Sequence, residues 1–124
     1  MKTRSVIPPF EARVAQRGRL RIVEVDGEVD ILTAPRLAAA VKDDDAFDAL
    51  VLDVAKMPFI SSSGLRVIVS LHRRLARRGG GVAVVAVQPF VERILEMVGL
   101  IDALVVAADV PTAAKLLRHE AAPG

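Results

Sequence analysis

Two short and almost wholly apolar segments constrain the fold of this 124-residue chain most strongly, residues 50–54 (LVLDV) and 82–87 (VAVVAV). Segments of this kind are typical of parallel strands that are buried on both faces. Between them, apolar side chains recur at helical spacing, in a stripe of Leu65, Ile68, Leu71, His72 and Leu75. A strand, a helix and a second strand predict a β-α-β unit with a right-handed crossover.

Weaker patterns extend this unit on both sides. Residues 10–16 alternate apolar and polar side chains and precede a turn at 17–19, which predicts the first strand of a hairpin. Thr33 is a suitable N-cap for a short helix with Pro35 in its first turn. The predicted strands are residues 10–16, 20–26, 50–54, 82–87 and 104–107, and the predicted helices are residues 34–41, 65–78, 90–98 and 110–117. The order β-β-α-β-α-β-α-β-α favours an α/β domain with a parallel or mixed sheet.

Composition excludes several classes of function. A formal net charge of +2 and an aromatic content of 3%, all Phe, argue against a nucleic-acid binder. The chain has no cysteine, and its two histidines, His72 and His119, have no carboxylate at ligand spacing, so we expect no metal and no cofactor. Its apolar runs are far shorter than the roughly 20 residues of a membrane span. We expect a cytoplasmic protein with one domain at residues 10–118 and loose tails at residues 1–9 and 119–124.

The most informative local feature is the run Ser61-Ser62-Ser63-Gly64, which lies where a buried strand gives way to a helix. The hydroxyl of Ser62 or Ser63 can cap the free amides of the first helical turn. A phosphate at the same place would meet the positive end of the helix dipole, and Arg66 is close enough along the helix to approach it. The residues alone leave both interpretations open, a helix cap or a phosphorylation site.

A serine hydrolase is a third hypothesis. Ser62, then Asp102 or Asp109, then His119 follow the Ser…Asp…His order of the α/β-hydrolases. Ile60, however, stands where the nucleophile turn needs a small residue, and His119 lies five residues from the end of the sequence, where fraying is expected. The pattern therefore argues against this kind of enzyme.

Two motifs together resemble the STAS family, the bacterial anti-sigma factor antagonists. The segment from LVLDV at residues 50–54 to FISSSGL at residues 59–65 resembles the family signature, and GEVD…TA at residues 27–34 resembles its second motif at the expected distance upstream. The similarity in motifs, element order and length covers roughly residues 10–117. It implies a STAS-like single domain, a mixed sheet with helices packed on one side, and no catalysis by the protein itself.

The resemblance also implies a switch between partners. Members of this type bind an anti-sigma factor that is also a serine kinase, and so release a sigma factor. Phosphorylation of a signature serine ends the binding, and a serine phosphatase restores it. The implied acceptor is the residue before the signature glycine, Ser63, with its neighbour Ser62 as the alternative. The implied partner-binding residues are Asp30, Ile31, Leu32, Thr33, Pro35, Ser61, Ser62, Gly64, Leu65 and Arg66.

Two residues depart from the family pattern. Ser61 stands where the signature usually begins with Asp, and Arg66 stands where a small residue usually follows Gly-Leu. These changes remove a negative charge and add a positive one. They leave open a STAS scaffold, or an accessory subunit of a lipid-transport ATPase, that works without phosphorylation. The oligomeric state is also open, because Phe59 and Ile60 would mediate pairing if exposed and belong to the core otherwise.

Overall fold

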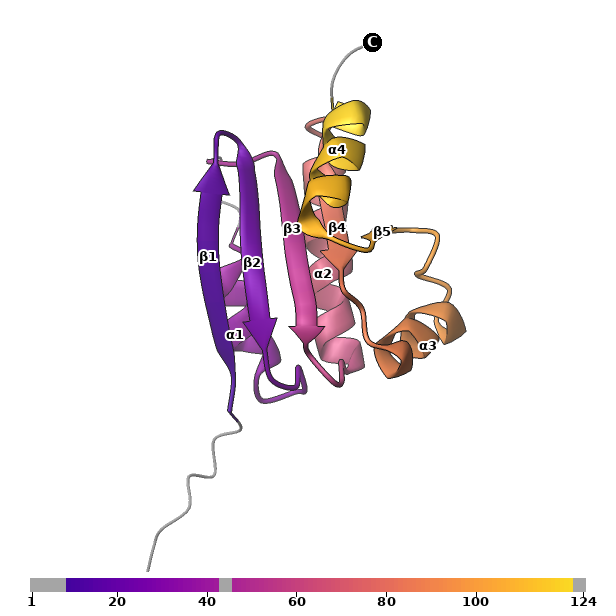
Figure 1. The fold of residues 1–124 in the computed structure, drawn as a ribbon. Coiled ribbons are helices and arrows are strands. Elements are labelled where there is room, and N and C mark those ends of the chain that lie inside the picture. Colours follow the sequence, from indigo (N-terminus) through magenta and orange to yellow (C-terminus); the bar gives the residue numbers. More distant parts are fainter. Residues whose placement is uncertain (1–8, 43–45, 122–124) are drawn as a thin grey trace, which may run out of the picture.

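The computed structural model describes residues 9–42 and 46–121, with side chains up to residue 117. Residues 43–45, three consecutive Asp, and most of the two expected tails lie outside these residues. Within them, the order of strands and helices is the predicted one (Figure 1). The elements are β1 (Glu11–Arg17), β2 (Leu20–Asp26), α1 (Ala34–Ala40), β3 (Ala49–Lys56), α2 (Ser62–Ala76), β4 (Gly81–Val85), α3 (Pro89–Met97), β5 (Val105–Ala107) and α4 (Val110–Ala121).

The described strands form one mixed sheet in the order β1-β2-β3-β4-β5. β1 pairs antiparallel with β2 around a turn in which Gly18 has a φ of 58°, a conformation that favours glycine. β2, β3, β4 and β5 are mutually parallel. The carboxyl ends of β2, β3 and β4 therefore lie at one end of the sheet, where the chain turns into α1, α2 and α3 (Figure 1). The α/β mixed-sheet fold expected from the sequence is confirmed.

The two faces of the sheet carry separate apolar cores. On one face, Leu50, Leu52 and Val54 of β3 belong to the larger core, which includes the buried side chains of α1, α2 and α3. On the other face, the alternate positions of β3 and β4 pack against α4. This smaller core comprises Ala49, Val51, Ala83, Val85, Ala113 and Leu117.

The expectation that the helices pack on one side is therefore wrong for α4. Figure 1 shows α4 in front of the sheet and α1 and α2 behind it. The physical reason is that Val51, Ala83 and Val85 are apolar and point away from the larger core, so they need a second layer to exclude water.

Two local details differ from the sequence expectation. Thr33 is the residue before α1, but its hydroxyl donates to the Glu28 carbonyl at 2.7 Å and makes no capping bond to the helix. α4 continues to Ala121, four residues beyond its predicted end, and Arg118, Glu120 and Ala121 have good helix propensity. In the described part of the chain, the helices are too short or too polar to cross a bilayer.

The second core predicts that two adjacent leucines of α4 contribute very differently to the free energy of unfolding. Leu117 is fully buried, so Leu117→Ala should lower the free energy of unfolding by about 2–5 kcal/mol. Leu116 is 42% exposed, and Leu116→Ala should change the free energy of unfolding by less than about 0.5 kcal/mol. Urea unfolding followed by far-ultraviolet circular dichroism measures both, because the chain has no Trp or Tyr for fluorescence. Equal effects of the two substitutions would contradict the packing of α4 on the sheet.

Candidate functional site

The two sequence motifs meet beyond the ends of β2 and β3. Val29 and Ile60 form an isolated parallel bridge between the loops that follow these strands. The Val29 amide donates to the Phe59 carbonyl at 2.9 Å, and the Ser61 amide donates to the Val29 carbonyl at 2.7 Å. Both bridge side chains are buried. The bridge extends the sheet by one step, and it holds residues 30–35 beside the start of α2.

Gly64 allows α2 to begin directly against this bridge. A Cβ atom at residue 64 would lie 2.6 Å from Cγ1 of Val29 and 2.8 Å from Cγ1 of Ile60. Both distances are well below van der Waals contact between carbon atoms. The glycine of the signature is therefore required by close packing, since a larger residue would push the amino terminus of α2 away from the bridge.

The three serines occupy three different environments. Ser61 is the N-cap of α2, and its hydroxyl accepts a hydrogen bond from the Gly64 amide at 3.4 Å. The expectation that Ser62 or Ser63 caps the helix is therefore wrong by one or two residues. Ser62 is exposed and Ser63 is half-buried, both in the first turn of α2. Serine and aspartate are comparable N-caps, so Ser61 in place of Asp preserves the cap and removes its charge.

Asp30 organises the loop that leads into α1. Its carboxylate accepts hydrogen bonds from the Leu32 amide at 2.9 Å and the Thr33 amide at 3.0 Å. The bond from the Thr33 amide, ahead of the other contacts, lowers the pKa of Asp30 from its ordinary value. The Asp30 amide in turn donates to the Thr33 hydroxyl at 2.9 Å, and Thr33 is fully buried. This reciprocal pairing fixes the shape of residues 30–33.

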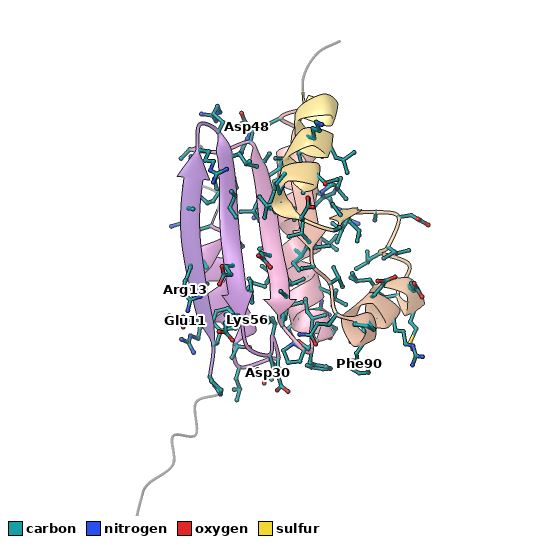
Figure 2. All side chains as sticks on the ribbon, in the orientation of Figure 1. Glu11, Arg13, Asp30, Asp48, Lys56 and Phe90 are labelled. Carbon is teal, nitrogen blue, oxygen red and sulfur yellow. The ribbon has the colours of Figure 1, made fainter. Side chains whose placement is uncertain are left out.

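The ordered loop presents two large apolar side chains to solvent. Ile31 is 74% exposed and Leu32 is 63% exposed. Figure 2 shows the adjacent Asp30 at the end of the sheet opposite Asp48, and Phe90 at the same end as Asp30. Phe90 of α3 stacks on Phe59 of the loop after β3, with 6.5 Å between the ring centroids, a contact that has no local signal in the sequence. This end of the molecule therefore exposes three large apolar side chains, Ile31, Leu32 and Phe90.

The predicted site residues fall into three groups by burial. The exposed residues are Ile31, Leu32, Pro35, Ser62 and Arg66; the half-buried residues are Asp30, Ser61 and Ser63; and the buried residues are Thr33, Gly64 and Leu65. The buried group shapes the surface from beneath and does not offer contacts of its own. Of the two residues that would mediate pairing if exposed, Ile60 is a core residue and Phe59 is half-buried.

The geometry contradicts the hydrolase hypothesis. Ser62 belongs to α2 on one face of the sheet, whereas residue 119 belongs to α4 on the other face. The carboxylate of Asp109 caps α4 by accepting a hydrogen bond from the Thr112 amide at 2.9 Å. Nδ1 of His72 accepts a hydrogen bond from the Val82 amide at 2.9 Å and so fastens α2 to β4. Among the described residues, no three His, Asp or Glu side chains come together as metal ligands.

Comparisons with known proteins agree with this architecture. A protein-family model described as the STAS domain matches residues 11–113. The chain is 34% identical over 84 residues to the anti-sigma F factor antagonist of Paenibacillus polymyxa, an alignment that covers 64% of this chain and 70% of that protein.

Solved structures of anti-sigma factor antagonists share the fold of this chain. An anti-sigma factor antagonist from Mycobacterium paratuberculosis is 28% identical, has a TM-score of 0.79, and the match covers 89% of this chain and 95% of that one. The phosphorylated form of the Bacillus cell fate determinant SpoIIAA has a TM-score of 0.66 over 87% of this chain and 99% of its own. At 15% identity, this second likeness concerns the fold alone.

The close contact between Gly64 and the bridge predicts that one methyl group added at residue 64 destabilises the fold. Gly64→Ala should lower the free energy of unfolding by about 1–3 kcal/mol through overpacking, although alanine favours a helix by up to about 1 kcal/mol. Ser62→Ala, in the same turn but exposed, is the matched control and should have little effect. In a double-mutant cycle, Gly64→Ala should cost less when Val29→Ala removes the closer of the two clashing atoms. Additive effects would contradict the proposed contact.

The hydrogen bonds to Asp30 predict a pH dependence of stability. A carboxyl whose pKa is lower in the folded state stabilises the fold above its ordinary pKa of 3.8, and this contribution is lost as the pH falls through the lowered value. The stability difference between wild type and Asp30→Asn should therefore be constant near neutral pH and shrink below about pH 4. Urea unfolding from pH 7 to pH 2 measures it. Asp102→Asn is the control, because Asp102 makes no hydrogen bond with described residues, and an unchanging Asp30→Asn difference would contradict the prediction.

Proposed function

This chain belongs to the STAS domain family, and from that membership we propose that it is an anti-sigma factor antagonist, a regulator and not an enzyme. The proposed partner is an anti-sigma factor that is also a serine kinase, and the complex would free a sigma factor in the cytoplasm. Relatives named as anti-sigma factor antagonists, one at 34% and one at 28% identity, support this role.

One observation carries the proposal, the two exposed side chains that the bridge holds beside the start of α2. Ile31 and Leu32 face solvent in a loop whose backbone is fixed by Asp30. An ordered apolar pair of this kind suits a protein partner, because burying it gains free energy without the entropic cost of ordering the loop. The proposed binding surface is therefore residues 30–35 together with residues 61–66.

We further propose that phosphorylation of Ser63 switches this binding off and that a serine phosphatase restores it. A phosphate in the first turn of α2 is compatible with the fold, since it lies at the positive end of the helix dipole. The same phosphate adds about two negative charges within the proposed interface. Removing such a charge from water costs several kcal/mol unless the partner supplies a matching cation. Ser62 is the alternative acceptor because it is exposed in the same turn.

A second candidate function is a STAS scaffold, or an accessory subunit of a lipid-transport ATPase, that binds its partner without phosphorylation. Ser61 favours it, because the N-cap serine lacks the carboxylate that the family signature usually carries beside the acceptor. Arg66, exposed in the next turn, shifts the charge of the same surface in the same direction, because it adds a positive charge where the missing carboxylate removes a negative one.

The two candidates differ in the mass of the protein after incubation with ATP and the anti-sigma kinases of its source organism. The switch predicts one added phosphate, present in wild type and Ser62→Ala and absent in Ser63→Ala. It also predicts that the phosphorylated protein binds the kinase at least about tenfold more weakly, a difference of about 1.4 kcal/mol. Intact-mass spectrometry and a binding isotherm measure these quantities.

Other outcomes of these two measurements would distinguish the acceptor serines, and the switch from the constitutive scaffold. A phosphate that is lost only with Ser62→Ala would move the acceptor by one residue. Tight binding to an anti-sigma factor with no phosphate on any variant would contradict the switch and support the constitutive scaffold. Substituting both Ile31 and Leu32 with Ser should abolish binding in either case, because both proposals use the same apolar pair.

A further inference from the structure

An open groove of about 960 Å³ runs along the outward side of α2. Three segments line it: α1, α2 and the connection that follows α3. The apolar lining residues are Ala38, Val41, Leu65, Val67, Val69, Val98 and Leu100, and the polar ones are Ser62, Ser70, Arg66, Arg73, Arg74 and Arg77. No acidic side chain of the described residues is part of this lining.

Three of the four arginines that line the groove have no acidic partner among the described residues. Arg66, Arg73 and Arg77 are exposed and form no ion pair with any residue that the structure describes. The neighbouring Arg78 differs, since it lies near Asp48 and donates to the Phe47 carbonyl at 2.6 Å. The dipole at the end of α2 favours basic residues in the last turn, but Arg66 lies in the first turns, where the dipole opposes it.

Most apolar side chains that line the groove are less exposed than these arginines. Leu65 and Val41 are buried, whereas Val67, Val69 and Leu100 are half-buried and Val98 is 52% exposed. An ordinary solvated helix face accounts for the arginines. It does not explain the apolar wall of the groove, which is the set of apolar lining residues given above. A row of cations above an apolar surface is instead complementary to an amphipathic segment with acidic edges.

We propose that this groove binds an acidic amphipathic helix of a partner protein. Arg66 and Arg77 are eleven residues apart, which at 1.5 Å per residue gives a length of about 16 Å, or about three helical turns. Acidic residues along the edges of the bound helix would meet Arg66, Arg73 and Arg77. Its apolar stripe would cover Val67, Val69, Val98 and Leu100, the larger apolar lining residues that are not buried. The inference rests on the groove alone and does not depend on the proposed function.

Two other occupants fit the groove less well. A lipid surface is bound by apolar side chains that project beyond the basic ones, whereas here the arginines are the more exposed group. A nucleic acid would need a more basic protein, because the net charge of +2 leaves little excess for tracking phosphates. A carboxylate-bearing helix uses both the charge and the apolar wall.

The test is a fluorescence-anisotropy titration of the full chain with a labelled 14-residue synthetic helix that carries Leu on one stripe and Glu on both edges. The double variant Arg73→Glu/Arg77→Glu should weaken binding at least tenfold. The matched control, Arg93→Glu/Lys115→Glu, has the same change in net charge at exposed positions outside the groove and should bind like wild type. Val98→Asp should weaken binding severalfold, because it places a repelling charge in the apolar wall.

Circular dichroism first establishes that each variant is folded. No binding to wild type at 1 mM peptide, or equal losses in the groove and control variants, would overturn the proposal. Equal affinity for a scrambled peptide of the same composition would also overturn it, since charge alone would then be sufficient. Sedimentation with vesicles of phosphatidylcholine and phosphatidylserine that depends on Arg73 and Arg77, with no binding of the helix, would reassign the groove to a membrane surface.

Discussion

The parallel bridge between Val29 and Ile60 is the interaction on which the candidate site depends. Two backbone hydrogen bonds of 2.7 and 2.9 Å join loops that belong to separate sequence motifs. Without them, the loops after β2 and β3 would diverge, because no regular strand pairing continues beyond Asp26 and Lys56. The bridge is also the surface on which Gly64 rests, so it sets where α2 begins. One short contact therefore fixes the serines and the exposed loop relative to each other.

The two-sided sheet shows what the hydrophobic pattern could predict. The apolar runs at residues 50–54 and 82–87 indicated strands buried on both faces, and the structure confirms this with Val51 and Val85 in a core that α4 covers. The expectation that all helices lie on one side came from the family resemblance and conflicted with this pattern. Periodicity was the better guide, because an apolar side chain that points away from the main core requires a second layer.

The site was harder to predict in detail than the fold. The sequence indicated that the serine run caps α2, but three identical residues carry no information about which one turns the chain. The extended backbone of Ser61, with φ −87° and ψ 171°, decides this, and it depends on the bridge next to it. Asp30 was expected near the partner surface, and its internal hydrogen bonds explain how it acts there, by ordering Ile31 and Leu32. The stack of Phe59 on Phe90 left no local signal, since it joins residues from distant elements.

The proposed interface and the α2 groove meet at the first turn of the same helix. Ser62 lines the groove and lies four residues before Arg66, whereas Ser63 is outside the groove lining. Residues four apart are neighbours on a helix surface, so a phosphate on Ser62 would neutralise an arginine that an acidic ligand needs. A phosphate on Ser63 would lie outside the groove lining, three residues before Arg66, and would act first on the proposed interface of residues 30–35 and 61–66. The adjacent serines thus differ in which surface a negative charge would affect, and the choice of acceptor determines which of the two contacts is regulated.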